Sequence, residues 1–116
     1  MKIGIMVRSG PYAQQNIDTA LNLLNKALDM GHQVALFLFE DGVINAHALM
    51  RPTGDRNIGQ QVGELVSRGA EVAVCGQCAN YRGLQKEQLV PGVKRAGMGQ
   101  LGQMVATCDR FFSLGP

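Results

Sequence analysis

The stretch VALFLF, residues 34–39, indicates the fold class most directly. All six residues are apolar, without the alternation of apolar and polar residues seen in a strand that has one face in water. Such a run is typical of a parallel β-strand whose two faces are both covered by helices. Residues 2–7 and 71–75 are further β-prone runs. The sequence therefore predicts a sheet built largely from buried, parallel strands.

Amphipathic helices are predicted between these strands. Residues 16–30 carry apolar side chains at helical spacing, and Gly31 follows as a stop. Further helices are predicted over residues 58–69, from Gly76 to Gly83, and in a last segment with an apolar face of Leu101, Met104, Val105 and Cys108. Short strands are predicted at residues 93–96 and 111–112. This alternation predicts one α/β domain over residues 1–116, a three-layer α/β/α sandwich with a mostly parallel five-stranded sheet.

The segment between the second strand and the second long helix is less regular. Residues 41–49 fit either a short helix or a structured loop. Residues 50–57 (MRPTGDRN) are polar and contain proline and glycine, so they are expected to form an exposed, mobile loop.

The composition excludes several classes of function. The net charge is only +2 and the eleven Lys and Arg are scattered, so no basic patch for nucleic acid is expected. No apolar run reaches the roughly 18–20 residues of a membrane span. The first residues, MKIGIMVRSG, lack the features of a signal peptide. With only three cysteines and no disulfide framework, the protein is expected in the cytoplasm, where thiols stay reduced.

The motif VCGQCANYRGL, residues 74–84, contains the candidate reactive group. In open parallel sheets ligands and reactive groups gather beyond the carboxyl ends of the strands, and Cys75 ends the third strand. A helix that starts directly after Cys75 would point free N–H groups at its sulfur and favour the thiolate. Gly76 would let a partner molecule approach, and Arg82 could stabilise negative charge nearby.

Other readings of the cysteines fit less well. A thioredoxin-type dithiol usually follows an early strand, whereas Cys75 and Cys78 follow the third. One C-x-x-C motif supplies two zinc ligands where a structural site needs four, and Cys108, His32 and His47 are not at ligand spacing. Cys108 is expected in the core, and the two histidines in a turn and a solvated loop. No metal or cofactor site is predicted.

Four segments together resemble the DsrE/TusD group of sulfur-relay proteins, within the DsrE/DsrF-like family. They are SGPYAQQ, GHQVALFLFEDGVINAH, VCGQCANYRGL and MGQLGQMVATCDRFFSLG, in this order over most of the chain. The resemblance implies that Cys75 accepts sulfane sulfur as a persulfide from a small carrier protein of the TusA type and hands it on. It also marks Gln77, Asp41 and Asn45 as supporting residues.

The resemblance further implies the biological setting. It suggests a homotrimer or hexamer, other DsrE-family subunits as partners, and no cofactor. The sulfur would serve either tRNA 2-thiouridine formation, in which a later enzyme binds the tRNA, or dissimilatory sulfur metabolism.

The role of Cys78 stays open, because TusD-like proteins have a small apolar residue at this position. Cys78 could be an accessory thiol, or it could attack a persulfide on Cys75, release sulfide and leave a disulfide. Three hypotheses result: sulfur transfer on Cys75, which the sequence favours because transfer needs only an exposed, ionised thiol; a thiol–disulfide oxidoreductase that uses both cysteines; and a non-catalytic oligomeric binding protein.

Overall fold

Five parallel strands form one sheet in the computed structural model, which describes residues 1–115. The strands are β1 (Lys2–Val7), β2 (Gln33–Leu38), β3 (Glu71–Cys75), β4 (Lys94–Ala96) and β5 (Arg110–Leu114). Their order is β4-β3-β2-β1-β5, and every pairing is parallel. The predicted α/β class is confirmed, with a sheet that is parallel throughout.

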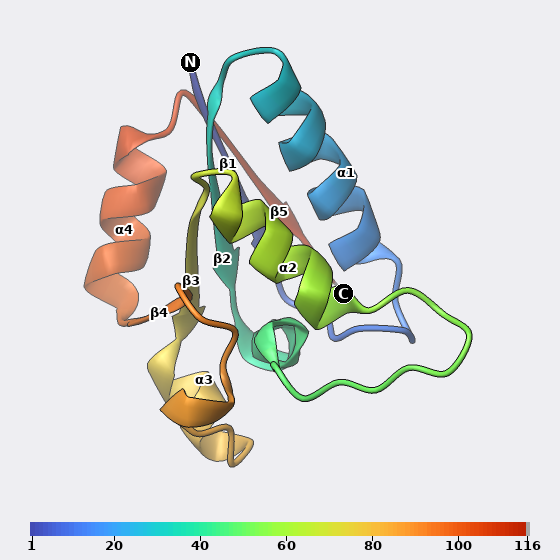
Figure 1. Cartoon of the computed structure of the whole chain (residues 1–116). Coiled ribbons are helices and arrows are strands. Elements are labelled where there is room, and N and C mark those ends of the chain that lie inside the picture. The colour runs from blue at the N-terminus through green and yellow to red at the C-terminus, as the bar shows by residue number, and fades with distance from the viewer. Residues whose placement is uncertain (116) are drawn as a thin grey trace.

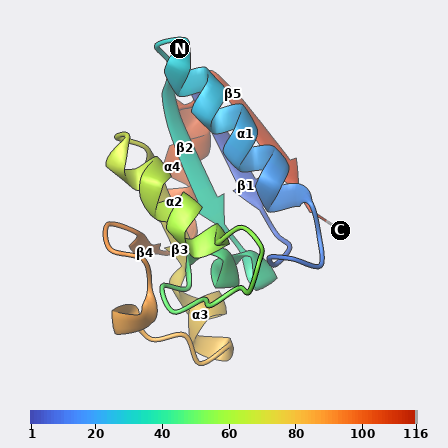
Figure 2. The ribbon, with the colours of Figure 1, turned by 45° about the vertical axis from the view of Figure 1, so that its right-hand side comes forward.

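Helices cover the two faces of this sheet unequally. They are α1 (Asn16–Asp29), η1 (Glu40–Ala46), α2 (Ile58–Ser67), α3 (Gly76–Tyr81), η2 (Lys86–Gln88) and α4 (Met98–Thr107), where η denotes a 3₁₀ helix. Helices α1 and α2 lie on one face and α4 lies alone on the other, which gives the predicted three layers (Figures 1 and 2). The short α3 lies beyond the carboxyl end of β3. No helix within residues 1–115 is both long and apolar enough to cross a membrane.

The main core lies between the sheet and the α1–α2 pair. Ile5, Leu36 and Val72 are in register on neighbouring strands, so their side chains share one face of the sheet. The predicted apolar face of α1 packs against it through Ile17, Ala20, Leu21, Leu24 and Ala27. Because β2 is buried at five of its six positions, it has the continuous apolar sequence that predicted the fold.

The opposite face is covered by α4 (Figure 1) and combines small residues, such as Gly4 and Ala35, with the larger Phe37. A side chain at Gly4 would meet the Cys108 sulfur at 2.7 Å and the Phe111 ring at 2.8 Å, so only glycine fits there. Ala35 pairs with Gly4 and lies on the same face. The helix can therefore approach the strands closely, with Met104 as its one buried residue.

Two of the four residues predicted to form the apolar face of the last helix, Val105 and Cys108, are placed differently in the structure. Val105 is 44% exposed and points away from the sheet. Cys108 follows the last turn of the helix and is half-buried, packed against the core as a partial filler. No residue of α4 is charged. Its outer surface is consequently neutral along its whole length.

Residues 50–57 are exposed in their middle and tied down at the end. The Arg56 guanidinium makes two hydrogen bonds of 2.7 Å to the Asp18 carboxylate of α1. The Tyr12 hydroxyl donates to the Arg56 carbonyl at 2.9 Å. The expected exposure is therefore confirmed for Thr53–Asp55 but not for Arg56, which is half-buried. The mobility of the loop stays a prediction.

Candidate functional site

Cys75 occupies the junction predicted for it, as the last residue of β3 and the N-cap of α3. Its backbone is extended, and the helix begins at the next residue, Gly76. The Cys75 sulfur accepts a hydrogen bond from the backbone N–H of Cys78 at 3.4 Å. An N-cap normally presents a hydroxyl, amide or carboxylate oxygen to such an N–H, so a thiol in this place is unusual.

The Cys75 side chain is nevertheless buried, whereas sulfur transfer led us to expect an exposed thiol. Cys75 is only 6% exposed and belongs to the hydrophobic core. Strand alternation directs its side chain to the same face of the sheet as Ala73, and the first turn of α3 caps the sulfur. A reagent or partner therefore has little direct access to the Cys75 side chain.

Cys78 lies against Cys75 and is the more accessible of the two. Burial raises the pKa of the Cys78 thiol above its ordinary value, and its hydrogen bond to Cys75 raises the pKa further. The backbone N–H of Glu40 and the charge of Arg82 act in the opposite direction. Cys78 therefore favours the neutral thiol, which can donate a hydrogen bond to the Cys75 sulfur.

The Glu40 backbone that meets Cys78 adopts an uncommon conformation. Its φ angle is +54°, a region that costs a non-glycine residue on the order of 1–3 kcal/mol. The Glu40 carboxylate accepts a hydrogen bond from Arg8 at 2.6 Å, which helps to hold this conformation. Strained backbone of this kind gathers at functional sites, and sequence analysis did not identify Glu40.

Arg82 and Asp41 meet in the structure, although they are 41 residues apart in the chain. The Arg82 guanidinium binds the Asp41 carboxylate at 2.7 and 2.9 Å and donates to the Cys78 carbonyl at 3.1 Å. Arg82 is thus engaged with η1 and with the backbone of α3. The charge of Arg82 acts to lower the pKa of Cys78, but burial and Cys75 outweigh it. A role of Arg82 in stabilising charge near the Cys75 sulfur stays a prediction.

Arg95 is a second arginine at the site, and no motif in the sequence marks it. It extends from β4 and donates to the Gly76 carbonyl at 3.1 Å and to the Asn80 side chain at 2.7 Å. A third, longer bond of 3.4 Å reaches the Leu84 carbonyl. Arg95 pairs with Val74 in the sheet, and only this register brings it beside α3.

The other residues predicted to support the site are Gly76, Gln77 and Asn45, and they differ in burial and in contacts. A side chain at Gly76 would come no closer than 3.6 Å to Arg95, so crowding within the chain does not require glycine there. Gln77 is exposed and donates to the Tyr81 hydroxyl at 3.3 Å. Asn45 is fully buried, and its amide donates to the Ser9 and Gly42 carbonyls, both at 2.9 Å. It anchors η1 to the turn after β1 and bonds to neither cysteine.

Both histidines lie against backbone groups. His32 lies within 3.2 Å of the N-terminal amino group, and His47 accepts from the Leu49 N–H. Across residues 1–115, no three side chains of His, Cys, Asp or Glu cluster as metal ligands would.

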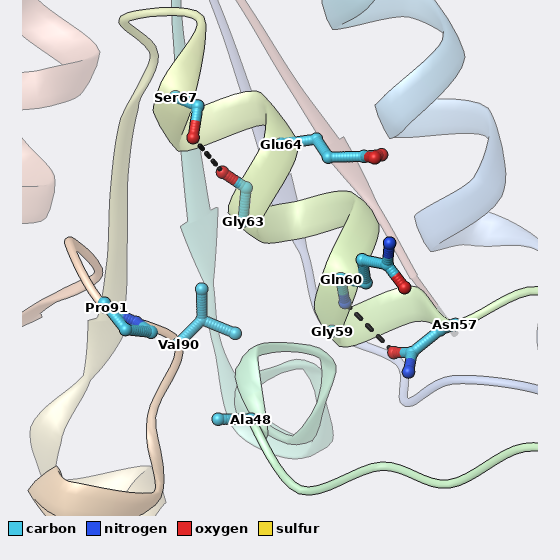
Figure 3. A pocket seen from close by; sticks show the side chains of 9 residues that line it. All are labelled: Ala48, Asn57, Gly59, Gln60, Gly63, Glu64, Ser67, Val90 and Pro91. Atoms are coloured by element: carbon cyan, nitrogen blue, oxygen red, sulfur yellow. Dashed lines mark hydrogen bonds between the residues drawn. The ribbon is translucent and has the colours of Figure 1, made fainter.

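A groove of about 550 Å³ runs along α2 (Figure 3), lined by Ala48, Asn57, Gly59, Gln60, Gly63, Glu64, Ser67, Val90 and Pro91.

Known proteins are similar to this one over nearly the whole chain. The model of the DsrE/DsrF-like family matches residues 1–114. A sulfurtransferase TusD of Sodalis glossinidius is 31% identical, over 92% of this chain and 93% of its own. A putative sulfurtransferase DsrE of Allochromatium vinosum is 30% identical, over 99% of each chain.

A solved structure confirms the fold. The crystal structure of the YchN protein from E. coli superposes with a TM-score of 0.90, over 98% of this chain and 99% of its own. Since the sequence identity is 24%, this likeness concerns the arrangement of strands and helices alone.

Proposed function

We propose a function for this chain, which belongs to the DsrE/DsrF-like family. The protein is a sulfurtransferase that carries sulfane sulfur as a persulfide on Cys75. The sulfurtransferase names of the TusD and DsrE relatives support this class of activity. The observation that carries the assignment to Cys75 is its place at the carboxyl end of β3, with a backbone N–H already directed at the sulfur.

The transfer step needs only thiol chemistry. The Cys75 thiolate attacks the terminal sulfur of a donor persulfide, the donor's S–S bond breaks, and the donor leaves as a thiolate. A new S–S bond forms on Cys75, and the same step in the other direction hands the sulfur on. One S–S bond is made for each one broken, so no oxidant, reductant, metal or cofactor takes part. The Cys78 N–H stabilises negative charge on the Cys75 sulfur.

The partners follow from the same proposal. A TusA-type carrier protein supplies the sulfur, and related DsrE-family subunits pass it toward tRNA 2-thiouridine formation or dissimilatory sulfur metabolism. No direct contact with nucleic acid or a membrane is part of this proposal. The setting is the cytoplasm, since a persulfide carrier needs its thiols reduced.

We also propose a homotrimer or hexamer, in which α4 contributes to the interface between copies. Its outer surface carries no charge and exposes Met98 (60%) and Val105 (44%). Neutral surface with exposed apolar side chains is typical of interfaces. Val105→Lys should lower the mass measured by native mass spectrometry toward the 12.5 kDa of one chain. Leu23→Lys, at an exposed position of α1, is the matched control and should not.

Mass spectrometry after incubation with a small persulfide donor tests the chemistry. The wild type should gain one sulfur atom on Cys75, and Cys75→Ser should gain none there. Retention of the added sulfur in Cys78→Ser makes Cys78 an accessory residue. Absence of sulfur from Cys75 in the wild type, under conditions that load a known carrier, would refute the proposal.

A thiol–disulfide oxidoreductase is the second candidate, because the Cys78 thiol lies against Cys75. In this function Cys78 attacks the Cys75 persulfide, sulfide leaves, and a Cys75–Cys78 disulfide remains. The wild type would then end as the disulfide with one sulfide released per chain. Cys78→Ser would stop at the persulfide and lose turnover.

A further inference from the structure

The short helix α3, which caps the buried sulfur, is held largely by polar contacts. Ala79 is its only fully buried residue. Gln77, Asn80 and Tyr81 are exposed, and Tyr81 reaches 78%. An element with so little buried apolar surface has a low free energy of local opening. Because Cys75 is 6% exposed, opening of α3 would increase the access of a reagent to its side chain.

Two arginines fasten this helix to the rest of the protein. Arg95, from β4, bonds the Gly76 carbonyl at its start and the Asn80 side chain. Arg82, directly after its end, bonds the Cys78 carbonyl and the Asp41 carboxylate of η1. The two attachments differ in their chemistry: Arg95 bonds only uncharged groups, whereas Arg82 forms an ion pair with Asp41. The Asp41 side chain is 68% exposed and that of Arg82 28%, so salt and an arriving molecule can reach this ion pair.

We propose that α3 is a movable cover over Cys75, and that Arg82 and Asp41 are positioning residues whose ion pair holds this cover closed. The proposal rests on the proposed function for its biological meaning, since the cover would keep a sulfur on Cys75 away from solvent until a partner docks. Its physical content concerns only the accessibility of a thiol. It can therefore be tested without any sulfur donor.

The expected size of the effect follows from the exposure of the pair. Exposed ion pairs shift an equilibrium by a factor of roughly two to five, and salt weakens them. Removing one partner should thus raise the open fraction of α3 about two- to five-fold. Reaction of a small reagent with Cys75 should accelerate by the same factor when opening is fast and reaction is slow.

Alkylation of the full-length protein by iodoacetamide measures this accessibility. The rate at Cys75 is followed by fragmentation of the tryptic peptide 69–82, which also contains Cys78, and Cys108 is followed as an internal reference. Asp41→Asn removes the charge that holds Arg82, and Asp41→Glu keeps it. Asp29→Asn is the matched control, because it breaks the Arg68–Asp29 pair, also 2.7 Å long, between α2 and α1.

The proposal expects four results together. Asp41→Asn raises the Cys75 rate about two- to five-fold and leaves the Cys108 rate unchanged. Asp29→Asn leaves the Cys75 rate at the wild-type value. Asp41→Glu reacts more slowly than Asp41→Asn. Raising the salt concentration accelerates Cys75 in the wild type but not in Asp41→Asn.

Three results would overturn it. One is a wild-type Cys75 that reacts as fast as a model thiol, which would mean that no cover exists. Another is the same Cys75 rate in Asp41→Asn and in Asp29→Asn. The third is an equal acceleration of Cys75 and Cys108, which would indicate general destabilisation. A protein that shows the expected alkylation pattern but takes up no persulfide would retain the cover and lose the proposed function.

Discussion

Helices α2 and α3 precede and follow β3 in the chain. They begin with the same kind of N-cap, but α2 is held by buried apolar side chains and α3 largely by polar contacts. In both, the N-cap side chain accepts an N–H from the residue three positions on. Asn57 accepts from Gln60 at 3.0 Å, and Cys75 accepts from Cys78 at 3.4 Å. Four residues of α2 are buried, among them Ile58 and Leu65, whereas α3 buries one.

The difference shows that one cap geometry can be built on a strong or a weak hydrogen-bond acceptor. At α2 the cap is an amide oxygen, a strong acceptor that satisfies the helix start. At α3 the cap is a sulfur, which is a weaker acceptor. The weaker cap is tolerated because arginines outside the helix hold α3 in place. Four measurements would break or sharpen this comparison.

The largest contrast should be in core packing. Leu65→Ala should lower the free energy of unfolding by about 2–5 kcal/mol, because it removes a fully buried side chain of α2. Ala79→Gly in α3 should cost only about 1 kcal/mol. Urea denaturation measures both, with Leu23→Ala on the exposed surface of α1 as the control. Equal losses in the two helices would remove the contrast.

The caps themselves should differ next. Asn57→Ala should cost about 1 kcal/mol of stability, since it leaves the Gln60 N–H without its acceptor. Cys75→Ser should cost less, because the hydroxyl can still accept from Cys78, while sulfur loading is lost. Thermal unfolding and persulfide mass spectrometry, run on the same samples, separate the two effects. A larger loss of stability in Cys75→Ser would show that Cys75 is mainly structural.

The pH dependence of Cys78 gives a smaller effect. Because its pKa is raised, alkylation of Cys78 should begin at higher pH than alkylation of free cysteine. The neutral thiol is favoured on folding, so this stabilisation is present at low pH. It is lost as the pH rises from the ordinary thiol pKa through the raised one. In Cys75→Ala the midpoint should fall only part of the way, since burial remains. A midpoint at the free-cysteine value in the wild type would contradict the raised pKa.

The smallest effect concerns the segment that leads into α2. Amide hydrogens of Thr53–Asp55 should exchange fast, and those after Arg56 slowly. Arg56→Gln removes the ion pair with Asp18 and should spread fast exchange to the start of α2, at a cost below about 1 kcal/mol. Strong protection of Thr53–Asp55 in the wild type would show that the loop is ordered.

Periodicity in the sequence was sufficient for the fold and for the place of the candidate cysteine, Cys75. The apolar run of β2 and the helical spacing of α1 identified their elements, and the end of β3 located Cys75. These are local signals, since they depend on residues that are neighbours in the chain. The burial of Cys75 was missed because exposure depends on what lies above the strand end, which no local pattern encodes.

The contacts around the sulfur depend on pairing between distant segments. Arg95 reaches α3 only through the register of β4 on β3, and Asp41 meets Arg82 only because β2 and β3 are neighbours. The resemblance marked Asn45 as a supporting residue, and the structure shows that it bonds η1 to the turn after β1; a role in function stays a prediction. The uncommon backbone of Glu40 has no signature in a single sequence, because glycine is the usual residue at such an angle.

The pairing of β5 with β1 has a consequence for biosynthesis. Residues Ile3–Val7 take as their partners Arg110–Leu114, which are the last residues of the sheet to leave the ribosome. Until then β1 is an open edge on that side, with N–H and C=O groups free to pair with another chain. Its closure waits until β5 has been synthesised, and contacts between such distant residues form slowly. Unpaired strand edges of this kind make a partly folded chain prone to aggregation.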